Sequence, residues 1–154
     1  MQLSDILRPD AVKVLASSTS KKRLFNDLGD MAETCYGFSS DDVLEALLDR
    51  ENLGPTGVGQ GIALPHARLE GVKSVCGLFL RLEKPLDFDA VDRQPVDLIF
   101  ALLAPSTAGV EHLKALALVS RTMRDPSVCA KLRANSVPAT LHAILTENPA
   151  TQAA

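Results

Sequence analysis

The sequence lacks the features that mark membrane and secreted proteins. It contains no apolar run of about 18 residues, the length that a membrane-spanning helix requires. Its most apolar stretch covers only residues 98–104. The N-terminal residues lack the basic and apolar regions of a secretory signal. We therefore expect a cytoplasmic protein with no stable membrane insertion.

Cysteines are few, and basic residues are dispersed. The 3 cysteines, Cys35, Cys76 and Cys129, are widely spaced and form no C-x-x-C pair. We expect them to be free, buried thiols. The net charge is −3, and the basic residues are scattered apart from the short run at 21–23. Nucleic acid is therefore not expected as a partner.

Length and apolar content are those of one compact domain, with 154 residues of which 46% are hydrophobic. We expect this domain to cover residues 1–147, followed by a flexible tail at 148–154. Helical spacing of apolar residues predicts a first helix over residues 20–32. A second helix is expected to begin at Ser39 or Ser40 and to end at Arg50 or Glu51, before Gly54 and Pro55.

Strand-like apolar runs follow over residues 62–64, 72–82 and 96–103. The last run is almost continuously apolar, which is typical of a central strand with both faces covered. The final third is helical again, with a helix over residues 110–123 and shorter helices after Pro126 and Pro138. The repeating apolar positions of the first of these helices are Leu113, Leu116, Ala117 and Ser120. Helices on both sides of a strand-rich middle predict an α/β fold, a three-layer α/β/α sandwich with a mixed β-sheet.

A glycine-rich loop lies before the first predicted strand. Gly57, Gly59 and Gly61 allow backbone conformations and close approaches that side chains would forbid. Their spacing is not that of G-x-G-x-x-G, and no G-K-[ST] follows. A dinucleotide site or a P-loop is therefore not expected, and we expect no cofactor.

His66 follows this loop at the end of a short predicted strand, directly after Leu64 and Pro65. Pro65 fixes its own φ and restricts Leu64, which stiffens the approach to the imidazole. A neutral imidazole is nucleophilic at about pH 7 and forms a labile phosphoramidate bond. His66 therefore suits a transient phosphoryl acceptor, although an isolated histidine in this place is also explained as a polar strand end.

Two further side chains are candidates for the same cleft. His112 begins a helix that follows the central strand, and a helix N-terminus at the end of a strand favours an anion. Arg50, at the end of the second helix, offers charge-assisted hydrogen bonds to phosphoryl oxygens. Taken alone, His112 is better explained as a helix-surface residue and Arg50 as a charge that complements the helix dipole.

Together these residues resemble the IIA proteins and domains of the fructose/mannitol type in the bacterial phosphotransferase system. The matching segments are Arg50-Glu51, Thr56-Gly-Val-Gly-Gln-Gly-Ile-Ala-Leu-Pro-His66, residues 95–105 and Glu111-His-Leu-Lys-Ala-Leu116. The resemblance implies that His66 is phosphorylated, as tele-phosphohistidine, with His112 and Arg50 as its partners in the cleft. It also implies the same mixed-sheet α/β/α fold.

Residues 86–92 and the following Gln94-Pro95-Val96 look most like the nitrogen-regulatory branch of that family. This implies a phosphocarrier that receives phosphate from an HPr-like protein and regulates targets such as transporters or kinases. The chain has no IIC segment and no IIB-type cysteine loop, which favours a phosphotransferase component that acts mainly as a regulator.

Two alternatives remain open from the sequence. The first is a free-standing fructose- or mannitol-specific IIA component that passes its phosphate to a IIB domain. The second is a zinc site formed by His66, His112 and an acid such as Glu111, because neighbouring imidazoles can bind zinc. Of these two alternatives the zinc site has the weaker support, and we expect no metal.

Overall fold

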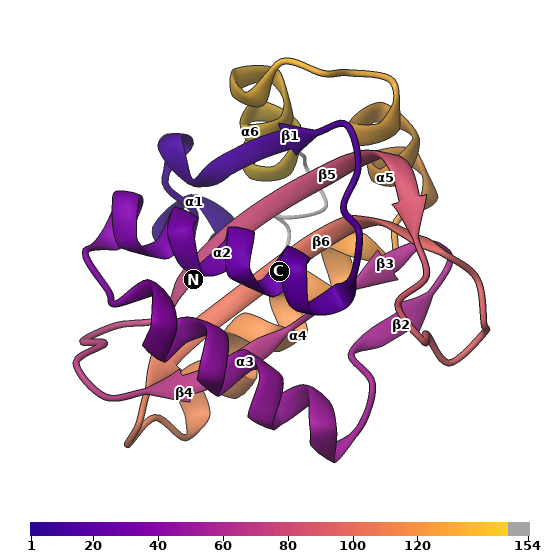
Figure 1. Cartoon of the computed structure of the whole chain (residues 1–154). Helices are drawn as coiled ribbons and strands as arrows, with labels where there is room; N and C mark the ends of the chain where they lie inside the picture. Colours follow the sequence, from indigo (N-terminus) through magenta and orange to yellow (C-terminus); the bar gives the residue numbers. More distant parts are fainter. Residues whose placement is uncertain (148–154) are drawn as a thin grey trace.

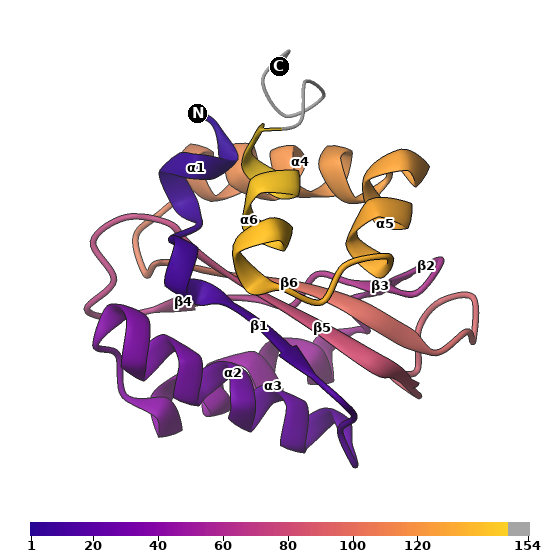
Figure 2. The same cartoon turned by 90° about the horizontal axis from the view of Figure 1, so that it is seen from above.

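The computed structural model describes residues 1–147 of the 154-residue chain. A β-sheet lies between two layers of helices (Figure 2). This confirms the predicted three-layer α/β/α sandwich. The predicted flexible tail at residues 148–154 lies outside the described residues.

The sheet has 6 strands and is mixed. Their bounds are Val12–Leu15 (β1), Gly57–Gly59 (β2), Ile62–Ala63 (β3), His66–Leu69 (β4), Cys76–Leu86 (β5) and Val96–Pro105 (β6). The order is β1-β5-β6-β3-β2, and β4 also pairs with β6. β6 is antiparallel to β5 and parallel to β3 and β4. Only Asp97 and Pro105 of β6 are not fully buried, which confirms the predicted central strand.

β3 and β4 lie end to end along the same edge of β6. Ile62 of β3 pairs with Leu98 of β6. Farther along, His66 of β4 pairs with Leu102 in the same register. Pro65 lies between the two strands and has no N–H to donate, but its carbonyl accepts the N–H of Leu102 at 2.9 Å. The proline therefore separates the strands without displacing them.

The predicted strands at 62–64 and 96–103 are confirmed as β3 and β6, with ends shifted by one or two residues. The strand predicted over 72–82 begins later, at Cys76, and continues through Pro85 to Leu86. A register shift in its pairing with β6 accommodates the proline. β1, β2 and β4 are too short for a clear alternation of apolar and polar residues, so the pattern misses them.

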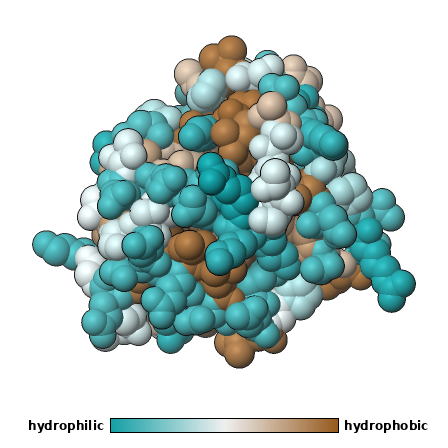
Figure 3. All heavy atoms as spheres, viewed as in Figure 1, coloured by the Kyte–Doolittle hydropathy of each residue, from teal (hydrophilic) through white to brown (hydrophobic). Residues whose placement is uncertain are grey.

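Helices α2 (Lys21–Tyr36) and α3 (Ser40–Leu53) cover one face of the sheet (Figure 2). Each begins after a serine whose side-chain oxygen accepts a backbone N–H, Ser20 for α2 and Ser39 for α3. α2 runs past its predicted end to Gly37, whose φ of 78° suits glycine. This face of the molecule is largely hydrophilic (Figure 3).

Helices α1 (Leu3–Ile6), α4 (Val110–Met123), α5 (Pro126–Arg133) and α6 (Pro138–Glu147) cover the other face. The 3-10 turn η1 (Pro9–Ala11) precedes β1. The bounds of α4 match the prediction, but its buried face does not: Leu113 is 63% exposed, whereas His112 and Ala115 are buried. The pattern treated His112 as polar and therefore solvent-facing. Among the helices described in residues 1–147, none combines the length and the apolar content of a membrane span.

Phenylalanines fill the core on both sides of the sheet. Phe25 of α2 and Phe88 of the β5–β6 connection meet edge to face, with ring centroids 5.8 Å apart. Phe79 of β5 and Phe100 of β6 form a second edge-to-face pair at 6.1 Å. All four rings are 0% exposed. The first pair ties the β5–β6 connection to α2.

Candidate functional site

The predicted residues meet at the open edge of the sheet beside β4. Within the described residues, β4 pairs only with β6. The strand β2 pairs with β3 and does not extend along β4, so the other edge of β4 is open. α3 packs on β4 from one face and α4 lies behind the sheet (Figure 1). A hollow of about 490 Å³ opens between these elements. Its lining residues are Ala46, Asp49, Arg50, Leu53, His66, Ala67, Arg68 and His112.

His66 is half-buried and begins β4, rather than ending a strand as predicted. Its Nδ1 lies 2.9 Å from the carbonyl oxygen of Leu64. A carbonyl can only accept, so this contact assigns the ring proton to Nδ1. Nε2 then carries the lone pair and makes no hydrogen bond within residues 1–147.

His112 is turned into the same hollow from the first turn of α4. Its ring centroid lies 5.6 Å from that of His66, and the ring planes are tilted by 45°. The residue is 6% exposed, and its Nδ1 is buried without a hydrogen-bond partner among the described residues. Burial, followed by the charges of His66 and Arg68, holds the pKa of His112 below its usual value. His112 is therefore not the helix-surface residue that its sequence context suggests.

Arg50 reaches the hollow from the last turn of α3. Its Nη1 donates to the carbonyl oxygen of Gly54 at 3.0 Å. None of the ion pairs found within residues 1–147 involves this guanidinium. Its remaining N–H groups make no other hydrogen bond with the described residues, so they are available to an anion.

Arg68 is a residue of the hollow that the sequence interpretation missed. It follows His66 by two positions on β4, so both side chains lie on one side of the strand. It also lines a second hollow of about 350 Å³, whose acidic residues are Asp42, Glu45, Asp49 and Glu70. Polar and apolar residues alternate from His66 to Leu69, but four residues are too few for this signal to have identified Arg68 from the sequence.

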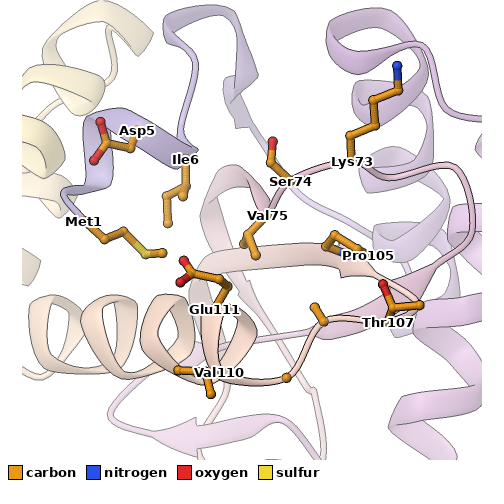
Figure 4. A pocket seen from close by; sticks show the side chains of 12 residues that line it. Met1, Asp5, Ile6, Lys73, Ser74, Val75, Pro105, Thr107, Val110 and Glu111 are labelled. Carbon is orange, nitrogen blue, oxygen red and sulfur yellow. The ribbon is translucent and has the colours of Figure 1, made fainter.

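Glu111 does not join the two histidines. It lines a larger hollow of about 710 Å³ beside α1, where Figure 4 shows it among Met1, Ile6 and Val75. Within residues 1–147, no three His, Cys, Asp or Glu side chains are grouped so that they could hold a metal ion. The zinc alternative therefore loses its third ligand.

The cysteines are free and buried, as predicted. Burial raises the pKa of the Cys76 thiol to about 12. Burial also raises the pKa of Cys35 and of Cys129. The described structure thus offers no activated thiolate as an alternative nucleophile.

Known proteins are similar to this chain along almost its whole length. Residues 5–148 match the family model described as "Phosphoenolpyruvate-dependent sugar phosphotransferase system, EIIA 2". The nitrogen regulatory protein of Bradyrhizobium diazoefficiens is 42% identical over 99% of this chain and 100% of its own. The nitrogen regulatory protein of Escherichia coli is 39% identical over 98% of this chain and 93% of its own.

A solved structure shows the same similarity in three dimensions. The crystal structure of nitrogen regulatory protein IIA-Ntr from Neisseria meningitidis has a TM-score of 0.86 with this chain. The two sequences are 41% identical, and the match covers 94% of this chain and 99% of that chain.

Proposed function

Because the chain belongs to the EIIA type-2 family of the phosphotransferase system, we propose that it accepts a phosphoryl group on His66 and regulates other proteins through that group. The state of the His66 ring is the observation that supports this most directly. Nδ1 is held by the Leu64 carbonyl at 2.9 Å, so Nε2 is left as the nucleophile. The acceptor atom is then Nε2, and the product is tele-phosphohistidine.

The transfer is an exchange between two imidazoles. Nε2 of His66 attacks the phosphorus of a phosphohistidine on a donor protein, and the donor N–P bond breaks as the new one forms. The donor ring, protonated on its other nitrogen, leaves as a neutral imidazole. His66 keeps its Nδ1 proton, and the Leu64 carbonyl stabilises the cationic ring that results.

The surrounding charges favour the phosphorylated form. A phosphoryl group brings close to two negative charges, and Arg50 and Arg68 both line the hollow that would receive it. In the unphosphorylated protein, burial is the main cause that holds the pKa of His112 below its usual value, so the ring that meets the incoming group is neutral at about pH 7. A neutral imidazole can donate one N–H to a phosphoryl oxygen, so we assign Arg50 and His112 to stabilising the group rather than accepting it.

The nitrogen-regulatory branch is favoured over the sugar-specific alternative, because the relatives at 39% and 42% identity are nitrogen regulatory proteins. We infer that the donor is an HPr-like phosphocarrier and that the targets are proteins such as transporters or kinases. A target whose apolar or acidic surface covers the hollow loses affinity on phosphorylation, through desolvation and like-charge repulsion.

Phosphorylation by the general phosphotransferase enzymes of the host tests the assignment of His66. The wild type should acquire acid-labile, base-stable phosphate, and His66→Ala should acquire none. His142→Ala is the matched control, because His142 lies on α6, outside the hollow, where its ring Nε2 is 3.0 Å from the carbonyl oxygen of Leu7. Label that persists in His66→Ala and disappears in His112→Ala would contradict the assignment.

Partner binding tests the regulatory role separately. At least one protein should bind the unphosphorylated wild type and His66→Ala but not the phosphorylated wild type. If partners ignore the phosphorylation state and the phosphate passes readily to a sugar-specific IIB domain, the sugar-specific alternative is correct.

A further inference from the structure

Glu51 is buried beside the hollow but does not line it. It follows Arg50 in the sequence and is 8% exposed. Its carboxylate accepts the N–H of Thr56 at 3.0 Å and also the Thr56 hydroxyl. On the other side it pairs with the ammonium of Lys21 from α2, at 3.0 Å. A buried carboxylate is costly unless it is fully paired, and these contacts satisfy Glu51 at the point where the glycine-rich loop begins.

Thr56 links this carboxylate to the His66 ring. The Thr56 carbonyl accepts the N–H of Leu64 at 2.9 Å. The Leu64 carbonyl in turn accepts the Nδ1 proton of His66, also at 2.9 Å. The position of the Leu64 carbonyl, which selects the His66 tautomer, therefore depends on the position of Thr56.

Arg50 depends on the same short loop. Its Nη1 donates to the carbonyl of Gly54 at 3.0 Å, and Gly54 precedes Thr56 by two residues. The N–H of Gly54 donates to the Glu51 carbonyl at 3.2 Å. Between them, Pro55 restricts the backbone that joins Gly54 to Thr56. A displacement of Thr56 is thus passed to the carbonyl that holds Arg50.

We propose that Glu51 is a positioning residue for phosphoryl transfer: through Thr56 it sets the two carbonyl groups that hold Arg50 and His66. This rests on the proposed role of His66 as the acceptor. Without the Glu51 contacts, residues 54–56 lose their anchor and the Leu64 carbonyl no longer fixes the His66 proton on Nδ1. A fraction of molecules then carries the proton on Nε2, which cannot attack phosphorus.

Two variants separate this role from general stability. Glu51→Gln removes the charge, and Thr56→Val removes one hydroxyl while it keeps the carboxylate and its ion pair with Lys21. Thr146→Val is the matched control, because its buried hydroxyl donates to the His142 carbonyl at 2.8 Å within α6. We expect phosphoryl transfer from a phosphorylated HPr-like donor to slow about tenfold in Glu51→Gln, and by a smaller factor in Thr56→Val.

The tautomer of His66 is the measurement that a merely structural role would not move. Ring nitrogen NMR signals should show one tautomer, protonated on Nδ1, in the wild type and in Thr146→Val. They should show a mixture in Glu51→Gln and in Thr56→Val.

The proposal requires slower transfer and an altered tautomer in the same variant. A wild-type rate, or a slow rate with an unchanged ring, overturns it. If Glu51→Gln does not fold, Thr56→Val decides the question by the same criteria. Absence of phosphate on wild-type His66 is a different result, since it contradicts the proposed function itself.

Discussion

The imidazole rings of His66 and His112 lie 5.6 Å apart between centroids, although one belongs to the edge of the sheet and the other to a helix that covers its face. Two protonated rings at this distance repel each other. With burial as the larger cause, this neighbour helps to hold the pKa of His112 below its ordinary value. The pair therefore combines one ring whose Nδ1 is held by the Leu64 carbonyl with a second ring whose pKa is lowered.

Arg50→Lys keeps the charge but loses the planar fork of N–H donors. If the guanidinium makes a charge-assisted hydrogen bond in the transfer, the variant should lose about 1.5–3 kcal/mol of transition-state stabilisation. Single-turnover transfer rates measure this loss. Arg23→Lys on the exposed side of α2 is the control and should transfer at the wild-type rate. Equal rates for Arg50→Lys and the wild type would mean that other groups hold the phosphoryl oxygens.

His112 should make the stability of the protein depend on pH in a defined direction. Its pKa is lowered from 6.5 in the folded protein, chiefly by burial, so the unfolded chain binds this proton first as the pH falls. Stability therefore decreases as the pH drops through the unfolded value and stops decreasing below the folded one. The Tm of the wild type should fall more between about pH 7.5 and about pH 5.5 than that of His112→Gln. Parallel curves for the two proteins would refute this.

Arg68→Ala should raise the pKa of His112, because it removes a positive charge that disfavours the protonated ring. Arg68→Lys keeps a cation in this place and should leave the pKa close to that of the wild type. NMR titration of the His112 ring measures both. No change in Arg68→Ala would show that burial and His66 account for the whole shift.

Leu47→Ala should destabilise the fold by about 2–5 kcal/mol, because it leaves a cavity under α3 where Leu47 is 1% exposed. Leu53→Ala on the same helix is the control, since Leu53 is 84% exposed and should change stability by less than about 0.5 kcal/mol. Denaturant unfolding measures both values. Similar losses in the two variants would contradict the burial of α3 seen here.

Long elements with strong patterns could be predicted from the sequence. α4 has the bounds predicted from apolar spacing, although its buried face differs, and β6 shows the continuous apolar run of a covered strand. The strands β1, β2 and β4 could not be predicted, because each has too few residues to show a period. β1 and β4 are held by pairing with the distant strands β5 and β6. The local spacing of apolar residues does not indicate which distant strand a segment pairs with.

Three residues of the hollow could be predicted from the sequence, but their geometry could not. His66, His112 and Arg50 do line one hollow. The burial of His112 and the role of the Leu64 carbonyl depend on how α4 and β4 pack, which the order of residues does not reveal. The sequence suggests Glu111 as a third zinc ligand because it precedes His112. In the structure His112 faces the hollow, whereas Glu111 faces α1.

The shared register of β3 and β4 along β6 limits how this chain can change in length. Side chains alternate between the faces of a strand, so one residue inserted between Ile62 and His66 would turn the His66 ring to the opposite face. A residue added to the turn at 70–75, after β4 has ended, would leave that ring where it is. We therefore expect relatives with a histidine at this position to differ in length at the turn and not between Ile62 and His66.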